Sequence, residues 1–356
     1  MIRTLHIAAH IQPQHAAAQT SFKALVTTDK SGAAQIQTIG LDSPLLLQSP
    51  GALVVKVHYS GINYKDGLAV SGKGILKQHP MVAGIDGSGV VESSGDADFP
   101  RGTSVILTGW GAGENTPGSF SQFIKCNPAH LVKLPGKSMT LRQSQVLGTA
   151  GLTAMLCVIA IMQKTPPSST TLPIVVSGAA GGVGSISVIL LKKLGFRVTA
   201  VSGRADTLAS KLKAMGADEV IAREAIVTSK PKPLDTERWG GAVDTVGDKT
   251  LAAIVSQCAR GSVVAACGLA GGSSLNTTVF PFILRGVTLA GIDSVYASSA
   301  ERHSAWQLLA TLLTPQDYDM ICDAKTDVGL SGIKPVCTAI LSGQVHGHVV
   351  VDMSKD

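Results

Sequence analysis

The 356-residue sequence is poor in aromatic and charged side chains, which make up 4% and 15% of it. It has no basic run interleaved with aromatics, the pattern typical of nucleic-acid-binding proteins, so we expect no nucleic-acid partner. No uninterrupted apolar stretch reaches the ~18 residues that a membrane span needs, so we expect no membrane role. The six cysteines form no CxxC pair. This argues against a zinc ribbon and a disulfide framework, and it favours a reducing, cytoplasmic compartment.

The length and the remaining composition fit a globular protein of two domains. A chain of 356 residues, of which 45% are hydrophobic, is long enough for two domains of roughly 100–200 residues each. The net charge of +6 is carried by Lys and Arg scattered along the chain and fits a phosphate-bearing small ligand. Residues 1–20 contain no acidic side chain. We interpret them as a disordered leader, with an organellar transit segment as the alternative.

The pattern of elements changes near residue 148. Before it, short β-rich runs are separated by Gly- and Pro-rich turns, and the expected strands are 21–28, 52–59, 87–92, 103–108 and 119–125. After it, strands alternate with helices, which predicts an α/β fold with a doubly wound parallel sheet. The expected strands there are 171–177, 197–202, 219–222, 241–245, 262–267 and 287–291, and the expected helices are 152–162, 183–194, 205–215, 249–258 and 300–313.

Two further segments complete the expected organisation. The small and apolar residues of 148–162 indicate a buried helix between the domains rather than a membrane helix. A polar stretch at 319–327 and a final strand at 348–352 are too short for a third domain. We therefore expect both to return to the first domain.

The clearest local motif is a glycine-rich turn. The apolar strand 171–177 runs directly into Gly178, Gly181 and Gly184, and an amphipathic helix follows. Glycines at this spacing allow a tight turn, let backbone N–H groups approach a pyrophosphate, and seat the helix N-terminus against the anion. The strand-to-helix context favours dinucleotide binding, although such turns also serve packing alone.

The end of the next strand bears on the choice of cofactor. About 20 residues after Gly184, where a site for NAD usually has an Asp or Glu, the sequence reads Ser202-Gly203-Arg204. A hydroxyl and a guanidinium bind a 2′-phosphate through charge-assisted hydrogen bonds, which predicts NADPH as the cofactor. The alternative is that Arg204 is only a solvated residue at the start of a helix.

A family likeness extends over residues 22–350. It rests on the runs 63–66 (Asn-Tyr-Lys-Asp), 80–87, 108–115, 148–151, 200–204, 244–248, 265–272, 281–285 and 291–294. Together these runs resemble the medium-chain dehydrogenase/reductase superfamily. Within it, they are most similar to the zinc-free quinone-oxidoreductase-like branch that contains the acrylyl-CoA reductases.

The resemblance implies an architecture and the absence of a metal. It implies a GroES-like catalytic domain over 21–147 and 301–356, a Rossmann NADPH-binding domain over 148–300, and a cleft between them. It also implies a homodimer formed by edge-to-edge pairing of the Rossmann sheets, with 287–292 as the candidate edge. Zinc-binding relatives read Gly-His-Glu where this sequence has Gly84-Ile85-Asp86, so no metal is expected.

Site residues follow from the same comparison. We expect Tyr64 and Asn63 to be catalytic, with Lys65 as a helper and Asp66 structural. We interpret Asp86 as a turn anchor rather than a base, and Cys267 as a strand-end residue rather than a reactive thiol. His348 stands where the family usually has an arginine, which could weaken the binding of a CoA substrate. Cofactor contacts are expected from Tyr64, Gly178, Ala180, Gly181, Gly182, Val183, Gly184, Ser202, Gly203, Arg204, Thr245, Cys267, Gly268, Leu289 and Asp293.

The activity that the resemblance implies is NADPH-dependent reduction of the conjugated C=C bond of a small enoyl thioester such as acrylyl-CoA. Hydride addition places negative charge on the carbonyl oxygen, so a metal-free site must supply hydrogen-bond donors. Tyr64 is our candidate for relaying the proton, and bulk water is the alternative. A quinone or another enone is the alternative substrate. An NADPH-binding scaffold or RNA-interaction protein is the alternative of another class.

Overall fold

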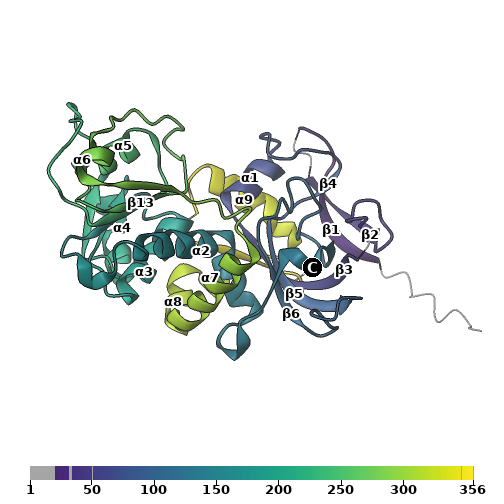
Figure 1. The fold of residues 1–356 in the computed structure, drawn as a ribbon. Coiled ribbons are helices and arrows are strands. Elements are labelled where there is room, and N and C mark those ends of the chain that lie inside the picture. The colour runs from purple at the N-terminus through teal and green to yellow at the C-terminus, as the bar shows by residue number, and fades with distance from the viewer. Residues whose placement is uncertain (1–20, 32–33, 50, 346, 356) are drawn as a thin grey trace, which may run out of the picture.

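The computed structural model describes residues 21–31, 34–49, 51–345 and 347–355. They form a β-rich domain beside a domain built on a parallel sheet, with helices α2 (Leu141–Met162) and α7 (Ser299–Leu312) near the junction (Figure 1). The predicted α/β architecture is therefore confirmed. The expected leader, residues 1–20, lies outside the described residues.

Two antiparallel sheets build the first domain. The smaller has the strand order β2-β1-β4, with β1 at Ser21–Thr27, β2 at Ala34–Gly40 and β4 at Met81–Val82. The larger has the order β15-β3-β5-β6-β8, and β7 also pairs with β3. Its strands are β3 (Leu53–Ile62), β5 (Asp86–Ser93), β6 (Ser104–Leu107), β7 (Phe123–Cys126), β8 (Leu131–Lys133) and β15 (Val349–Asp352). Alternate residues of β3, such as Leu53, Val55 and Val57, enter one apolar core because successive side chains point to opposite faces.

The last described strand and helix of the chain lie in this domain. Strand β15 pairs antiparallel with β3, with Val349 opposite Ile62. Helix α9 (Ile333–Leu341), which the sequence analysis did not predict, places Ile333 and Cys337 in the same core. It packs against α1 (Tyr64–Val70), another helix that was not predicted.

The second domain contains a six-stranded parallel sheet in the order β11-β10-β9-β12-β13-β14. Its strands are β9 (Ile174–Val176), β10 (Val198–Ser202), β11 (Glu219–Ala222), β12 (Gly241–Asp244), β13 (Val263–Ala266) and β14 (Thr288–Gly291). Its helices are α3 (Gly182–Lys193), α4 (Ala205–Ala214), α5 (Asp248–Gln257) and the short α6 (Phe280–Arg285), of which only α6 was not predicted. Central strands such as β9 are apolar throughout because both faces of the sheet are covered.

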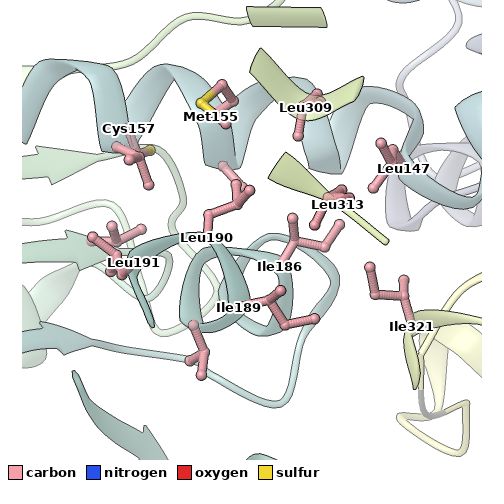
Figure 2. Packing of buried hydrophobic residues seen from close by; sticks show 14 of the residues in the cluster. Leu147, Met155, Cys157, Ile186, Ile189, Leu190, Leu191, Leu309, Leu313 and Ile321 are labelled. Carbon is pink, nitrogen blue, oxygen red and sulfur yellow. The ribbon is translucent and has the colours of Figure 1, made fainter. Parts of the chain in front are cut away.

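Helix α2 begins earlier than the predicted helix and is broken at Gly148, whose φ of 51° and ψ of −150° are not helical. Thr140 and Gln143 form a capping box at its start. By length and composition α2 could cross a membrane, but 67% of its apolar window is buried inside the protein, as in a core helix. Figure 2 shows Leu147 of α2 and Ile186 and Leu190 of α3 in the space between the two helices.

Helices α7 and α8 (Pro315–Ile321) pack on the parallel-sheet side of the molecule. Their residues Trp306, Leu309 and Ile321 share a buried cluster with α2 and α3, although their sequence position lies in the segment expected to join the first domain. Lys193 of α3 also pairs with Asp317 of α8 at 2.8 Å. Residues 319–321, the first of the polar stretch expected to return to the first domain, instead end α8, and Ile321 is buried in the cluster that contains α2 and α3.

Candidate active site

The carboxyl ends of the parallel strands bring most of the expected cofactor residues to one edge of the sheet. Val176 of β9 aligns with Ala200 of β10 and Val243 of β12. The residues that follow these strands therefore lie side by side. Gly178, Ser202, Thr245, Cys267 and Gly268 all stand at or just beyond such an end. Ligands of open parallel sheets bind at this edge.

The turn after β9 has the geometry that its glycines predict. Gly178 has a φ of 58°, in the left-handed region that favours glycine, and a Cβ there would overlap the hydroxyl of Thr245. That hydroxyl donates to the Ser177 carbonyl at 3.0 Å, which holds the turn against β12. A Cβ on Gly184 would overlap the Gly178 carbonyl, so the third glycine allows α3 to pack directly on the turn.

The N-terminus of α3 can accept an anion. Gly181 is its N-cap, and no side chain caps the helix in the described part of the chain. Its first amides therefore keep their donor capacity for a ligand. Gly181 is exposed, whereas Gly182 and Val183 are half-buried. The backbone amides of residues 181–183, which we call the cradle, fit the pyrophosphate of a dinucleotide.

Two guanidinium groups lie near the end of β10. The Ser202 hydroxyl accepts from the Arg204 amide at 3.0 Å, and Arg204 Nη1 donates to the Gly343 carbonyl at 3.2 Å. Arg223, which the sequence analysis missed, has Nη2 2.9 Å from where a Cβ on Gly203 would lie. The parallel pairing of Ser202 with Ala222 brings Arg223 there. A basic residue directly after the neighbouring strand was the available signal. Such a pair suits a 2′-phosphate.

Asn63 and Tyr64 start helix α1. The Asn63 side chain accepts from the amides of Lys65 at 2.9 Å and Asp66 at 3.2 Å, and Asp66 accepts from the Asn63 amide at 2.9 Å. This capping box occupies the side-chain oxygen of Asn63 and supports a positioning role. The catalytic role expected for Asn63 stays a prediction. Tyr64 is 59% exposed and is free to meet a ligand.

Asp86 joins α1 to the break in α2. Its carboxylate accepts from the Thr149 amide at 2.9 Å, from the Thr149 hydroxyl at 2.5 Å and from the Asn63 side chain at 3.2 Å. It thus caps the helical segment that restarts after Gly148, where a Cβ would come within 2.6 Å of Asp86 Oδ2. Burial raises the pKa of Asp86, and the hydrogen bonds from Thr149 and Asn63 oppose that shift. The geometry agrees with the expected anchoring role.

Asp66 and Lys65 also serve the start of α1. Asp66 is buried and accepts from the Ile85 amide at 3.0 Å, and burial raises its pKa well above the usual value. This fits the structural role expected for it. Lys65 pairs with Glu114 at 3.1 Å, which ties α1 to the loop after β6.

The other expected cofactor residues differ in their placement. Cys267 is half-buried at the sheet edge, and its thiol contacts the Asp244 carbonyl at 3.5 Å. Leu289 lies inside β14 rather than at its end. The Asp293 carboxylate accepts from the Val295 amide at 2.8 Å, so it closes its own turn. Ala180 is half-buried just before α3.

His348 lies against the start of α3. A Cβ on Gly182 would come within 2.8 Å of His348 Nε2, which is buried against the backbone of Gly182. Burial lowers the pKa of His348 to about 4. The imidazole is therefore neutral near pH 7 and does not replace the charge of the arginine that the family resemblance leads one to expect.

Comparison with known proteins agrees with this geometry. Residues 49–136 match the alcohol dehydrogenase GroES-like domain, and residues 182–311 match the zinc-binding dehydrogenase domain. The acrylyl-CoA reductase AcuI of Ruegeria pomeroyi is 41% identical, over 94% of this chain and 99% of that protein. This chain belongs to the medium-chain dehydrogenase/reductase superfamily, in the acrylyl-CoA reductase subfamily.

Two further relatives of this medium-chain reductase bear on its ligands. The structure of the YhdH oxidoreductase of Salmonella enterica in complex with NADP is 41% identical and superposes with a TM-score of 0.86, over 93% of this chain and 99% of that one. YhfP of Bacillus subtilis, named as a candidate quinone oxidoreductase, is 40% identical over 85% of this chain and 90% of that protein. Its solved structure holds NAD, with a TM-score of 0.86 over 94% of this chain and 100% of that one.

The second matching domain is named for zinc binding, so we searched this reductase for a group of metal ligands. Within the described ranges, no three His, Cys, Asp or Glu side chains gather as metal ligands. Asp86 is engaged with Thr149 and Asn63 instead. The expectation of a metal-free enzyme stays a prediction, which elemental analysis tests.

Proposed function

We propose that this chain is an NADPH-dependent reductase of the conjugated C=C bond of a small enoyl thioester such as acrylyl-CoA, and that it works without a metal. The observation that carries the proposal is the meeting of two sites. At the start of α3, a Cβ on Gly182 would lie 3.4 Å from Ala150 of α2. The neighbouring Thr149 donates to Asp86, and Asp86 also accepts from Asn63, the residue before Tyr64. The dinucleotide site and the start of α1 are therefore linked through Asp86.

The cradle and the two arginines are our proposed NADPH site. The first amides of α3 would hold the pyrophosphate, and Ser202, Arg204 and Arg223 would hold the 2′-phosphate. Thr245, Cys267 and Gly268 would line the remainder of the sheet edge. When bound, the cofactor supplies a hydride to the substrate.

The remaining chemistry would fall to side chains of this chain. Negative charge develops on the thioester oxygen, and a donor aimed at that oxygen stabilises it. The Tyr64 hydroxyl is our proposed donor, and it would also deliver the proton to the α-carbon. Solvent would then return a proton to the tyrosinate, since Tyr64 is exposed. Asn63 and Asp86 would act through Tyr64, because they fix the first turn of α1.

A screen of acceptors tests the proposal. NADPH oxidation is measured with acrylyl-CoA, crotonyl-CoA and a benzoquinone, and NADH serves as the control. We expect the highest kcat/KM with NADPH and acrylyl-CoA. Tight NADPH binding with no oxidation by any conjugated acceptor would instead support a nucleotide-binding scaffold.

Tyr64→Phe tests the proton relay. General acid catalysis contributes about 100-fold or more, so we expect kcat to fall by at least about tenfold while the Kd for NADPH stays within a few-fold. Unchanged kcat would assign the proton to water. Tyr59→Phe, on a half-buried tyrosine of β3 that has no part in the proposed site, is the matched control.

A quinone is the second candidate substrate, and His348 favours it. A neutral imidazole provides one cation fewer than an arginine would for the phosphates of CoA. The same hydride geometry serves any conjugated carbonyl. A kcat/KM for the benzoquinone above that for both CoA thioesters would decide for this candidate.

We further propose a homodimer through the β14 edge of the parallel sheet. β14 ends the strand order of the described sheet, and an edge strand offers unpaired backbone groups. Beside it, Val279, Phe280, Ile283 and Leu284 are 61%, 45%, 68% and 49% exposed, an apolar surface typical of an interface. Light scattering of the wild type should give twice the chain mass, and Ile283→Lys should give a monomer. A monomeric wild type would remove the proposal.

We propose a reducing compartment, the cytoplasm, as the location. All six cysteines are free. Burial raises the pKa of Cys126 and Cys258 to about 12, which makes both thiols unreactive near pH 7. The organellar alternative depends on residues 1–20, which lie outside the described residues.

A further inference from the structure

Arg302, in the first turn of α7, is a buried cation to which no motif drew attention. It is 1% exposed. Nowhere in the described ranges does it form an ion pair with a carboxylate. Burial lowers its pKa to about 10, so it stays charged near pH 7. A buried charge without an ion pair is costly. The charges of Asp86, Asp293 and Glu301 favour the guanidinium from a distance, and hydrogen bonds add to that compensation.

The guanidinium of Arg302 donates hydrogen bonds to segments of both domains. Nη1 donates to the Thr108 carbonyl at 2.7 Å and to its hydroxyl at 2.9 Å, just after β6 of the first domain. Nη2 donates to the carbonyls of Ser294 and Val295, both at 2.7 Å, in the segment after β14. Nε donates to the Ala297 carbonyl at 3.0 Å. The rigid fork of arginine makes this set of bonds possible, whereas a lysine ammonium cannot reproduce it.

The two segments are also in direct contact. The Trp110 amide donates to the Val295 carbonyl at 3.1 Å, and the Arg302 guanidinium carbon lies 4.8 Å from the centre of the Trp110 ring. A Cβ on Gly109 would come within 3.1 Å of Val295 and of Arg302. The position of the 294–297 segment relative to the first domain is therefore closely defined.

A chain of hydrogen bonds continues from Ser294 to the candidate active site. The Thr153 hydroxyl lies 2.7 Å from the Thr149 carbonyl and 2.6 Å from the Ser294 hydroxyl. The Thr153 hydroxyl can donate to either acceptor and so bridges the Thr149 carbonyl and the Ser294 hydroxyl. Thr149 in turn donates to Asp86, which holds Asn63 at the start of α1.

We propose that Arg302 is a positioning residue for hydride transfer. It holds the segment after β14, which belongs to the cofactor edge of the sheet, in register with the loop after β6 and the segment of Tyr64. This inference rests on the proposed function, because the relative position of the two domains affects the rate only if a hydride passes from NADPH on one domain to a substrate held by the other. Arg302 touches neither the glycine turn nor Ser202, so the binding of NADPH should change little when it is replaced.

Arg302→Met removes all of these bonds, and Arg302→Lys keeps the charge without the fork. We expect kcat to fall at least about tenfold in Arg302→Met, since a small misplacement is enough for such a loss. The deuterium isotope effect on kcat, measured with deuterated NADPH, should rise, and the Kd for NADPH should stay within about threefold. Arg302→Lys should be intermediate. Arg101→Met, at a surface pair where the Arg101 side chain is 74% exposed, should match the wild type.

The outcomes separate positioning from plain stability. A plain loss of stability would lower kcat only as far as it lowers the fraction of chains that bind NADPH, and it would leave the isotope effect at the wild-type value. That result would overturn the proposal. If Arg302→Met does not fold, Arg302→Lys and Thr108→Val, which removes only the hydroxyl acceptor, decide by the same isotope effect. A wild type that is inactive with every acceptor refutes the proposed function instead. Hydrogen exchange then tests whether Arg302 joins the two segments. Arg302→Lys should speed amide exchange in both 294–297 and 108–111, and unchanged exchange in either would overturn the proposal.

Discussion

Replacement of Asp86 by alanine should separate the acceptor role of its carboxylate from its charge. The carboxylate accepts from the Thr149 amide, the Thr149 hydroxyl and the Asn63 side chain. In Asp86→Ala the hydroxyl can rotate to another acceptor, but the two N–H donors cannot. Each buried donor left without an acceptor costs about 1–3 kcal/mol. Because Thr149 and Asn63 are only half-buried, we expect a total loss of about 2–4 kcal/mol in the free energy of unfolding.

Asp86→Asn is the matched variant. Its amide oxygen can take the place of Oδ2 and keep both N–H donors, and the Thr149 hydroxyl can accept from the new amide group. We expect it to lose about 1 kcal/mol or less. Asp319→Ala, at an exposed position of α8, controls for the loss of a carboxylate as such.

Urea unfolding followed by circular dichroism measures the three variants, and steady-state kinetics measures kcat on the same preparations. Asp86→Ala should be the least stable, and it should also lose activity, because the start of α1 that carries Tyr64 is no longer anchored. Equal unfolding free energies for Asp86→Ala and Asp86→Asn would refute the anchoring argument. Full activity in a destabilised Asp86→Ala would show that Tyr64 does not depend on it.

Four further predictions concern the cofactor, pH and metal. Gly184→Ala should abolish NADPH binding in calorimetry, because its Cβ would overlap the Gly178 carbonyl and displace α3 from the turn; wild-type affinity would contradict this. Arg223→Ala should raise the KM for NADPH about tenfold and leave that for NADH unchanged, and an equal change in both would remove the 2′-phosphate role. Burial raises the pKa of Asp66 and Asp86 above the usual 3.8, so the folded chain keeps its protons to higher pH than the unfolded chain. The free energy of unfolding should therefore fall as pH rises from 3.8 through the raised values, and less steeply in Asp66→Asn. Treatment with a chelator should leave activity intact, and an active preparation with stoichiometric zinc would contradict the metal-free proposal.

The parallel sheet and its glycine turn could be predicted because their signals are local. Apolar runs of strand length, interrupted by helices, indicate such a sheet without knowledge of any distant contact. The spacing of Gly178, Gly181 and Gly184 likewise lies within a single turn. Helix α9 also had a readable period, with Ile333, Val336, Cys337 and Ile340 on one face. Pro335 and the nearby glycines are helix-breaking residues, so the sequence there indicates a turn rather than a helix.

The missing site residues depend on contacts between distant segments. Arg223 reaches Gly203 only because β10 and β11 pair in parallel. Arg302 has its role through Thr108, which lies 194 positions earlier in the chain. The partners of the Asn63 side chain, which are the amides of Lys65 and Asp66 and the carboxylate of Asp86, are likewise known only from the structure. Local sequence patterns do not show which side chains of distant segments will form hydrogen bonds with one another.

The break in α2 has a consequence for protein engineering. Residues 141–147 and 149–162 are parts of a single connected helix, yet the break between them is capped by Asp86 of the first domain. A fragment that starts at the second part would lose this cap and would expose the partners of Leu147 on α3. Domain exchange between relatives should therefore keep the whole of α2 together with the strand that contains Asp86.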